Sequence, residues 1–187
     1  RGDNIIVSGG TGAGKTTLLN ALGEWCDPSE RIVVIEDTAE LQLPGEHLIK
    51  MEARPANSEG AGRVSIRDLV RNALRMRPDR IVVGEVRGAE TFDLMLALNT
   101  GHRGTLTTCH ANGAHSVLRR LIQLALLARS GLSPSDIHEQ LCDAIDVIVQ
   151  VSRDGADRVV TDIAGVSESG RLQSWWSNGA PAVSRAA

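Results

Sequence analysis

The sequence predicts an α/β domain with three layers, in which helices cover both faces of a mainly parallel β-sheet. Short runs rich in valine and isoleucine, such as RIVVIE at 31–36 and RIVVGE at 80–85, alternate with helical patterns along most of the chain. These runs are apolar at almost every position, which is typical of strands that are buried on both faces of a sheet. The helices between such strands supply the two outer layers.

The first two thirds of the chain contain these alternating elements. The helix from Ser65 has clear boundaries, because Ser65 with Asp68 three residues later favours a start and Pro78 favours a stop. Before it, residues 41–65 combine short extended pieces with a turn rich in Gly, Asn and Ser, so we expect a hairpin-like excursion and a mobile loop. The expected elements are strands at 4–8, 31–36, 80–85 and 105–109, and helices at 15–25, 65–76 and 89–99.

The last third predicts two further helices and an antiparallel hairpin. Apolar residues recur at helical spacing from Val117 to Ala128, and SPSD at 133–136 places a proline in the first turn of a shorter helix. The Asp-Gly pair at 154–155 is a strong turn signal between apolar runs at 144–152 and 158–166. We expect residues 1–166 to form one domain, followed at 167–187 by a weak edge strand and a flexible tail.

Composition narrows the class of protein. Of the 187 residues, 42% are hydrophobic and 23% are charged, as in ordinary globular domains. The formal net charge of −3 differs from the basic balance of most nucleic-acid-binding domains, so direct nucleic-acid binding is not expected. No apolar run reaches the roughly 18 residues that span a bilayer, and we expect a cytoplasmic protein. The three cysteines are widely separated, which argues against a disulfide framework.

The strongest motif lies between the first strand and the first helix. Residues 9–16 (GGTGAGKT) match G-x-x-x-x-G-K-[ST] at every fixed position, in the strand-turn-helix context of a phosphate-binding loop. Backbone N–H groups and the helix N-terminus can face the β-phosphate there, while Lys15 reaches the β- and γ-phosphates. Thr16 is expected on Mg²⁺ and Thr17 on the α-phosphate. The expected nucleotide-binding residues are Gly10, Thr11, Gly12, Ala13, Gly14, Lys15, Thr16 and Thr17.

Acidic residues end two of the predicted strands. Glu36 and Asp37 stand at the end of the strand at 31–36, and Glu85 ends the strand at 80–85. Because the carboxyl ends of parallel strands meet at the ligand crevice, these carboxylates are expected beside the phosphate loop. There they can polarise a water molecule or, as for Glu85, hold Mg²⁺ through a bound water. The alternative is that they only cap strand ends.

Two histidines flank the strand at 105–109. His102 precedes it and His110 follows it. A histidine at a strand end can donate a hydrogen bond to a γ-phosphate oxygen, although an isolated one is more often a polar cap. A metal site formed by His102, Cys109 and His110 is also conceivable, but no further ligands stand at suitable spacing.

The helix from Ser65 carries an arginine stripe. Arg67, Arg71 and Arg75 recur every four residues on one side of that helix. Such arginines can neutralise charge on a transferring phosphate, in the same subunit or from a neighbour, and Arg54 is an equal candidate. The alternative is a solvated basic face.

Together, four motifs resemble the secretion ATPases of type II and type IV systems, also called traffic ATPases. The motifs are GGTGAGKTT, VIEDTAEL, NALRMRPDRIVVGEVRGAET and NTGHRGTLTTCHAN, and the similarity extends over 3–166. Their arginine-rich sequence is most similar to the tight-adherence pilus and conjugation-like branch. The resemblance implies a RecA-like P-loop fold with a Walker A loop in the first motif. It also implies an aspartate box at Glu36 and Asp37, a Walker B glutamate at Glu85, and a histidine box with His102 and His110.

The resemblance further implies an activity and partners. Members of this family form hexameric rings that hydrolyse ATP between subunits and drive pilus assembly, protein secretion or DNA transfer. We therefore expect ATP and Mg²⁺ as ligands, and copies of this chain and an inner-membrane platform protein as partners, at the inner face of the cell membrane. Family members carry an N-terminal domain and a linker before the first strand, and that linker helps to clasp the base, so we expect this chain to be the C-terminal motor domain of a longer protein.

The sequence leaves other functions open. A GTPase would carry an N-K-x-D motif and an ABC-type ATPase an L-S-G-G-Q-like signature, and neither is present. A ring translocase acting on nucleic acid is the main alternative, because it would share the same core; a small-molecule kinase and a nucleotide-binding switch are the others. The chain has no tyrosine, a single Phe92, and tryptophans at 25, 175 and 176, so aromatic stacking on adenine is not expected.

Overall fold

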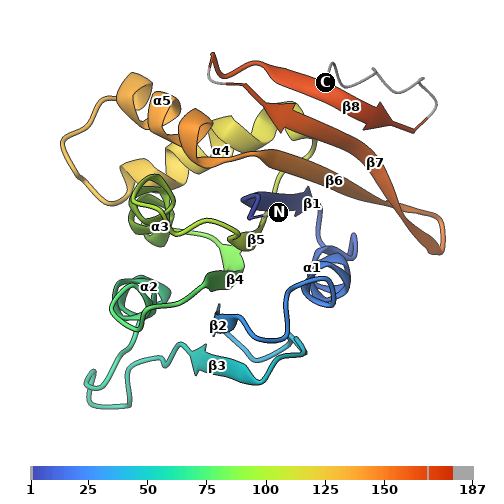
Figure 1. The fold of residues 1–187 in the computed structure, drawn as a ribbon. Coiled ribbons are helices and arrows are strands. Elements are labelled where there is room, and N and C mark those ends of the chain that lie inside the picture. Colours follow the sequence, from blue (N-terminus) through green and yellow to red (C-terminus); the bar gives the residue numbers. More distant parts are fainter. Residues whose placement is uncertain (1, 168, 179–187) are drawn as a thin grey trace.

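One mixed sheet forms the centre of the molecule (Figure 1). The computed structural model describes residues 2–167 and 169–178. Six neighbouring strands pair in parallel, and two more add as antiparallel pairs. Across the described sheet the order is β3 (His47–Glu52), β2 (Arg31–Glu36), β4 (Arg80–Val86), β5 (Leu106–Cys109), β1 (Ile5–Gly9), β6 (Val147–Asp154), β7 (Asp157–Val166) and β8 (Leu172–Ser177).

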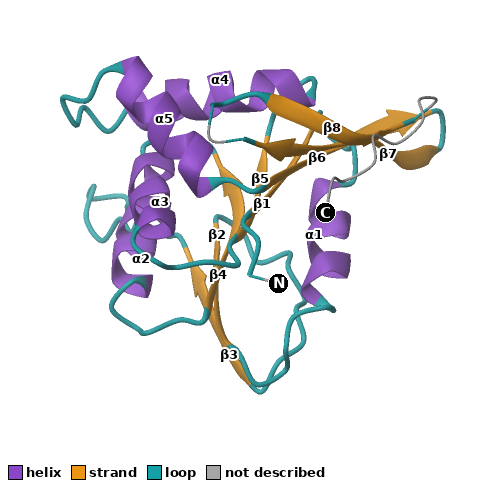
Figure 2. Cartoon of the chain, turned by 45° about the horizontal axis from the view of Figure 1, so that its top comes forward, coloured by secondary structure: helices purple, strands orange, loops and turns teal. Residues whose placement is uncertain are grey.

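The helices pack on the two faces of this sheet in unequal numbers (Figure 2). One face is covered by α1 (Lys15–Gly23), together with Leu41 and Leu43 of the loop after β2. The three-layer α/β prediction is confirmed, with one thin and one thick helical layer. The thick layer contains α2 (Ile66–Ala73), α3 (Glu90–Asn99), α4 (Ala114–Leu126) and α5 (Pro134–Ala144).

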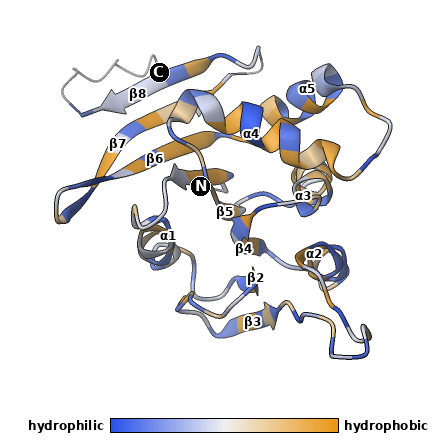
Figure 3. Ribbon diagram, turned by 180° about the vertical axis from the view of Figure 1, so that it is seen from behind, coloured by the Kyte–Doolittle hydropathy of each residue, from blue (hydrophilic) through white to orange (hydrophobic). Residues whose placement is uncertain are grey.

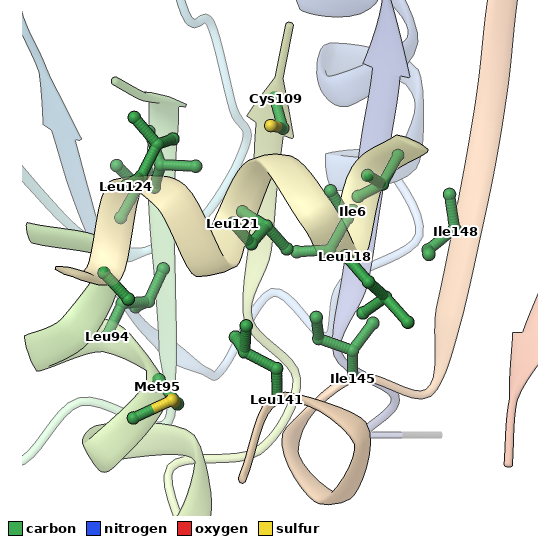
Figure 4. Close-up of a cluster of buried hydrophobic side chains, with 14 of the residues drawn as sticks. Ile6, Leu94, Met95, Cys109, Leu118, Leu121, Leu124, Leu141, Ile145 and Ile148 are labelled. Atoms are coloured by element: carbon green, nitrogen blue, oxygen red, sulfur yellow. The ribbon is translucent and has the colours of Figure 1, made fainter. Parts of the chain in front are cut away.

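Alternate residues along the central strands supply two separate cores. In β2, Val33 and Ile35 face the thick helical layer, whereas Ile32 and Val34 face α1. Figure 4 shows part of the larger core, with Leu121 of α4 among the side chains that it buries. Burial on both faces explains why these strands are apolar at nearly every position.

Local sequence signals set where two helices begin. Ser65 and Asp68 form a reciprocal capping box at the start of α2, as predicted. Ser133 and Asp136 form a second box at the start of α5, and Pro134 occupies its first turn. The predicted helix at 65–76 ends earlier, at Ala73, and turns follow before β4.

The interpretation of residues 41–65 as a hairpin-like excursion is wrong for its first half. Residues 47–52 form β3, which pairs in parallel with β2 and extends the sheet. Leu48 contacts one core while Ile49 and Met51 contact the other, so the strand extends both cores and covers the edge of β2. Only the following segment resembles a hairpin, because Arg54 and Val64 form an antiparallel bridge.

The hairpin predicted at 144–166 is confirmed as β6 and β7. Gly155 in its turn has φ of 58°, a left-handed conformation that favours glycine. The tip of this hairpin is hydrophilic and projects beyond the core (Figure 3). The weak edge strand after Val166 is β8, which pairs with β7. The tail predicted beyond it falls largely at 179–187, outside the described residues.

No helix in the described ranges has both the length and the apolar character that crossing a membrane requires.

Candidate active site

A cleft of about 780 Å³ opens where the parallel strands β1, β2, β4 and β5 end. The phosphate-binding loop forms one wall, because residues 11–17 all line the cleft. Glu36, Asp37, Glu85 and His110 line the same cleft. The carboxyl ends of adjacent parallel strands therefore bring these predicted residues together, as expected for a ligand crevice in an open α/β sheet.

Backbone conformation explains the glycines of the loop. Gly12 and Gly14 have φ of 70° and 94°, which other residues rarely adopt. A Cβ atom on Gly9 would lie 2.5 Å from the carbonyl oxygen of Val151, so this position has no room for a side chain. Lys15 Nζ donates hydrogen bonds to the carbonyl oxygens of Gly9 and Gly10 at 3.1 Å each, which hold the ammonium group against the loop.

A β-bulge lies at Glu85. The pairing of β4 with β5 shifts between Val83 and Val86, so two residues of β4 stand opposite one of β5. Thr108 Oγ1 donates a hydrogen bond of 2.7 Å to the carbonyl oxygen of Gly84, which fixes the irregular stretch. A Cβ atom on Gly84 would lie 3.2 Å from Cγ of Glu36, so glycine lets the two strand ends approach closely.

Arg87 joins two of the predicted carboxylates, although the sequence interpretation did not select it. Its Nε donates a hydrogen bond of 2.8 Å to Oε2 of Glu85, and its guanidinium lies 3.8 Å from Asp37. The hydrogen bond to Glu85 raises the pKa of Arg87. Glu90 accepts hydrogen bonds of 2.6 Å from the backbone N–H groups of Arg87 and Gly88, which shape the turn between them.

Glu36 and Asp37 occupy different environments. Glu36 is buried, and its Oε1 accepts hydrogen bonds from the backbone N–H groups of Glu40 and Leu41 at 3.0 and 2.9 Å. Its carboxylate therefore holds the loop after β2 in place, whereas Asp37 is exposed to the cleft. Glu40 also lines the cleft, with Oε2 at 3.4 Å from the hydroxyl of Thr16.

Two further arginines that the sequence interpretation did not select line the cleft. Arg120 comes from α4, and Arg158 comes from the β6–β7 hairpin. Neither belongs to a recognisable motif, because each reaches the cleft only through the packing of a distant element. Long-range topology, rather than local pattern, brings them to the site.

The structure separates His102 from the cleft. This residue lies in the loop before β5, whereas His110 directly follows β5. Because the cleft lies at the carboxyl end of β5, His102 is on the side of its amino end, and of the two histidines only His110 lines the cleft. The two histidines are therefore separated by the length of the strand.

The arginine stripe lies away from the cleft of its own chain. Arg71 Nε donates a hydrogen bond of 2.7 Å to Asp93 of α3, and Arg67 binds the other oxygen of the same carboxylate. Arg75 follows the end of α2, close to the start of β4 and thus away from the cleft. Arg54 follows β3, and its Nε donates to the carbonyl oxygen of Gly62 at 2.7 Å. None of these four lines the described cleft.

The cysteines are free thiols. Cys109 and Cys142 are buried, and burial raises the pKa of Cys109 to about 12. The Cys109 thiol is therefore protonated at neutral pH. Within residues 2–167 and 169–178, no group of three or more His, Cys, Asp or Glu side chains is arranged to hold a metal ion.

The chain is similar in sequence to proteins of a known family. The sequence profile described as "Type II/IV secretion system protein" matches residues 2–183. The chain belongs to that family. It is 53% identical over 171 residues to a protein of Mycobacterium tuberculosis named for conjugal transfer, a match that covers 90% of this chain and 48% of the relative. It is also 39% identical to the type IV secretion system protein PtlH of Bordetella pertussis, over 97% of this chain and 52% of PtlH.

Solved structures agree with the fold. The VirB11 ATPase from the Brucella suis type IV secretion system superposes with a TM-score of 0.77 and 34% identity, over 86% of this chain and 47% of VirB11. The pilus retraction motor PilT with bound ADP gives a TM-score of 0.63 and 28% identity, over 85% of this chain and 46% of PilT. The fold is therefore RecA-like, as predicted, and the similarity to the conjugation-like branch is confirmed. The chain spans about half the length of these relatives.

Proposed function

We propose that this chain binds Mg–ATP in the cleft and hydrolyses it, as the motor domain of a secretion, pilus-assembly or conjugal-transfer ATPase. The observation that carries the proposal is the position of Glu85, which faces the same cleft as the complete phosphate-binding loop. A phosphate loop alone accounts for binding, but hydrolysis also requires a group that directs water toward the γ-phosphate.

In the proposed complex, the phosphate loop supplies most of the binding. The backbone N–H groups of residues 11–16 and the N-terminus of α1 face the phosphates. Lys15 turns from the carbonyl oxygens of Gly9 and Gly10 to the β- and γ-phosphate oxygens, and Thr17 contacts the α-phosphate. These contacts bind the triphosphate whatever the base.

Oxygen donors suitable for Mg²⁺ surround the loop. The Thr16 hydroxyl would be a direct ligand of the ion, and Glu85 would hold it through a bound water. Mg²⁺ prefers oxygen ligands and keeps several waters when it is bound with a nucleotide, so a dedicated cage of carboxylates is not needed. When bound, the ion would neutralise part of the negative charge on the β- and γ-phosphates.

Hydrolysis follows from the remaining cleft residues. A water molecule attacks the γ-phosphorus in line with the leaving ADP oxygen, and Glu85 accepts the proton that this water loses. His110 donates a hydrogen bond to a γ-phosphate oxygen, and Asp37 helps to orient the water. Glu36 acts through the loop that it holds, and Arg87 positions Glu85.

Assembly and partners complete the proposal. Subunits form a hexameric ring with the nucleotide near the interfaces, beside an inner-membrane platform protein at the inner face of the membrane. Arg54, Arg71, Arg75 and His102 do not line the cleft of their own chain, so any role in catalysis is across a subunit interface. Arg54 suits such a role best, because it follows the carboxyl end of the outermost strand β3 and is exposed.

The rival function, translocation of nucleic acid, has less support. The net charge of the chain is −3, and Arg67 and Arg71 of the basic stripe are both paired with Asp93. A phosphate-tracking face needs unpaired cations, whereas these two arginines share one carboxylate within the fold.

The test measures nucleotide binding and hydrolysis in two variants. For the unsubstituted chain, Mg–ATP at about 100 times its Kd should raise the free energy of unfolding by about 2.7 kcal/mol. Lys15→Ala should lose this stabilisation, while Glu85→Gln should keep it and lose phosphate release. Phosphate release by Glu85→Gln equal to that of the unsubstituted chain would contradict the catalytic role of Glu85.

A second measurement separates the motor from the translocase. Stimulation of ATPase activity by single-stranded DNA, declining steeply as the salt concentration rises, would favour the translocase instead.

A further inference from the structure

The β6–β7 hairpin, whose ribbon extends away from the centre of the sheet (Figure 1), carries an arginine that lies against the phosphate-binding loop. Arg158 lies next to the turn of this hairpin, as the second residue of β7, and lines the cleft. Its stem packs on the loop, because a Cβ atom on Gly14 would lie 3.0 Å from Cγ of Arg158. Its Nη1 donates a hydrogen bond of 2.8 Å to the carbonyl oxygen of Ala156, which restrains the guanidinium.

The sheet order defines which end of the nucleotide meets this arginine. Glu85 and His110 end the strands β4 and β5, which lie on one side of β1. Arg158 comes from β7, which lies on the other side of β1 beyond β6. The γ-phosphate must face Glu85 for the water to attack. The nucleoside therefore extends in the opposite direction, toward the β6–β7 hairpin.

Tyrosine, phenylalanine and tryptophan side chains are absent from the described lining of the cleft. Phe92 packs against the core of the thick helical layer, and Trp25 follows the far end of α1. Trp175 and Trp176 belong to β8, where Trp176 pairs with Ile163 of β7, away from the hairpin tip. A purine in this cleft thus has no large aromatic ring of this chain to stack on.

A guanidinium can take the place of such a ring. It is planar and weakly hydrated, and it stacks on aromatic faces with a cation–π contribution. We propose that Arg158 forms the nucleobase platform of the ATP site, with its guanidinium stacked on the purine and its stem held by Gly14. This inference rests on the proposed binding of ATP.

The test compares two ligands that share the phosphate chain. Binding of Mg–ATP and of Mg–tripolyphosphate to this chain is measured by titration calorimetry. Arg158→Ala should weaken ATP binding about tenfold and leave tripolyphosphate binding unchanged. Arg158→Lys should not restore ATP binding, because lysine lacks the planar group, whereas Arg158→Trp should restore it. Arg153→Ala is the matched control, since Arg153 pairs with Arg158 across the hairpin but does not line the cleft, and it should change neither affinity.

Several results would overturn the inference. Unchanged ATP binding by Arg158→Ala would exclude a contact with the base. An equal loss of tripolyphosphate binding, with rescue by Arg158→Lys, would assign the residue to the phosphates as a simple charge. Tripolyphosphate binding also shows that each variant is folded. If the unsubstituted chain bound neither ligand, the proposed function itself would fail, whatever the result at Arg158.

Discussion

At the scale of single residues, Arg87 controls the position of the proposed catalytic carboxylate. It is the hydrogen-bond partner of Glu85 Oε2 and also lies within 3.8 Å of Asp37. A carboxylate that directs water must be held in one orientation, because a displacement of about 1 Å can reduce the rate by up to about a hundredfold. The charge of Arg87 thus links the two strand ends that carry acidic residues.

Removal of this side chain should therefore affect turnover more than binding. For Arg87→Ala, we expect kcat for ATP hydrolysis to fall by at least about tenfold while the Kd for Mg–ATP changes less than threefold. Arg87→Lys should recover part of kcat, since it keeps a charge but not the planar contact. A rate that rises in Arg87→Ala would mean that Arg87 restrains Glu85 rather than positions it.

The buried thiol of Cys109 makes the free energy of unfolding depend on pH in the alkaline range. Burial raises its pKa in the folded state from 9.0 to about 12, so the folded chain holds this proton more tightly than the unfolded chain. The resulting stability is fully present below about pH 9 and is lost as the pH rises toward 12.

We expect the free energy of unfolding to fall as the pH rises from 9 to 11, and to fall less steeply in Cys109→Ala. Urea titrations at a series of pH values measure both slopes. Cys26→Ala is the comparison variant, because Cys26 is only half-buried. Identical slopes in Cys109→Ala and the unsubstituted chain would show that this thiol does not contribute.

At the scale of elements, Asp93 fastens α2 to α3. Its carboxylate is 10% exposed and accepts hydrogen bonds from both Arg67 and Arg71. Two of the three arginines in the stripe therefore stabilise helix packing. The third, Arg75, is exposed.

Asp93→Ala should destabilise the fold, because it leaves two arginines without their common partner. We expect a loss of about 1 to 3 kcal/mol in the free energy of unfolding, reduced from the value for fully buried pairs because both arginines are partly exposed. Arg75→Ala should change stability by less than about 0.5 kcal/mol. Chemical denaturation of the two variants provides the comparison, and equal losses would contradict the assignment.

Elements with strong local signals were predictable, and those defined by long-range pairing were not. Ser65 and Ser133 with their partner aspartates begin α2 and α5 because a cap is a contact within one turn. Residues 47–52 carry no local signal of a parallel strand, because only pairing with β2 makes them one. The same limit applies to the site: the glycine-lysine motif identifies the loop, whereas Arg158 reaches it through a hairpin more than a hundred residues later.

The direction of a strand also cannot be read from a local motif. His102 and His110 flank the same strand, and the sequence treats them alike. The structure separates them, because only the carboxyl end of β5 borders the cleft. A histidine before a parallel strand is therefore a weaker candidate for contact with a ligand than one after it, because ligands bind at the carboxyl ends of such strands.

At the scale of the whole molecule, the cleft is built by two parts of the sheet on either side of β1. Strands β2, β4 and β5 bring the acidic residues and His110, while β6 and β7 bring Arg158. The phosphate loop after β1 joins the two parts. A nucleotide that occupies the whole cleft should therefore stabilise both of them, whereas a ligand limited to the phosphate chain should not reach the hairpin.

Amide hydrogen exchange can resolve this difference along the chain. Mg–ATP should slow exchange at residues 9–17, at 37–41 and at the hairpin tip 153–158, because binding to the native state opposes local opening. Mg–tripolyphosphate should protect the first two segments but leave 153–158 unchanged. α5 and β8, which contribute no residue to the cleft, provide the internal control. Equal protection of the hairpin by both ligands would mean that the tip responds to charge in the loop, and the division of the cleft into a phosphate part and a base part would be wrong.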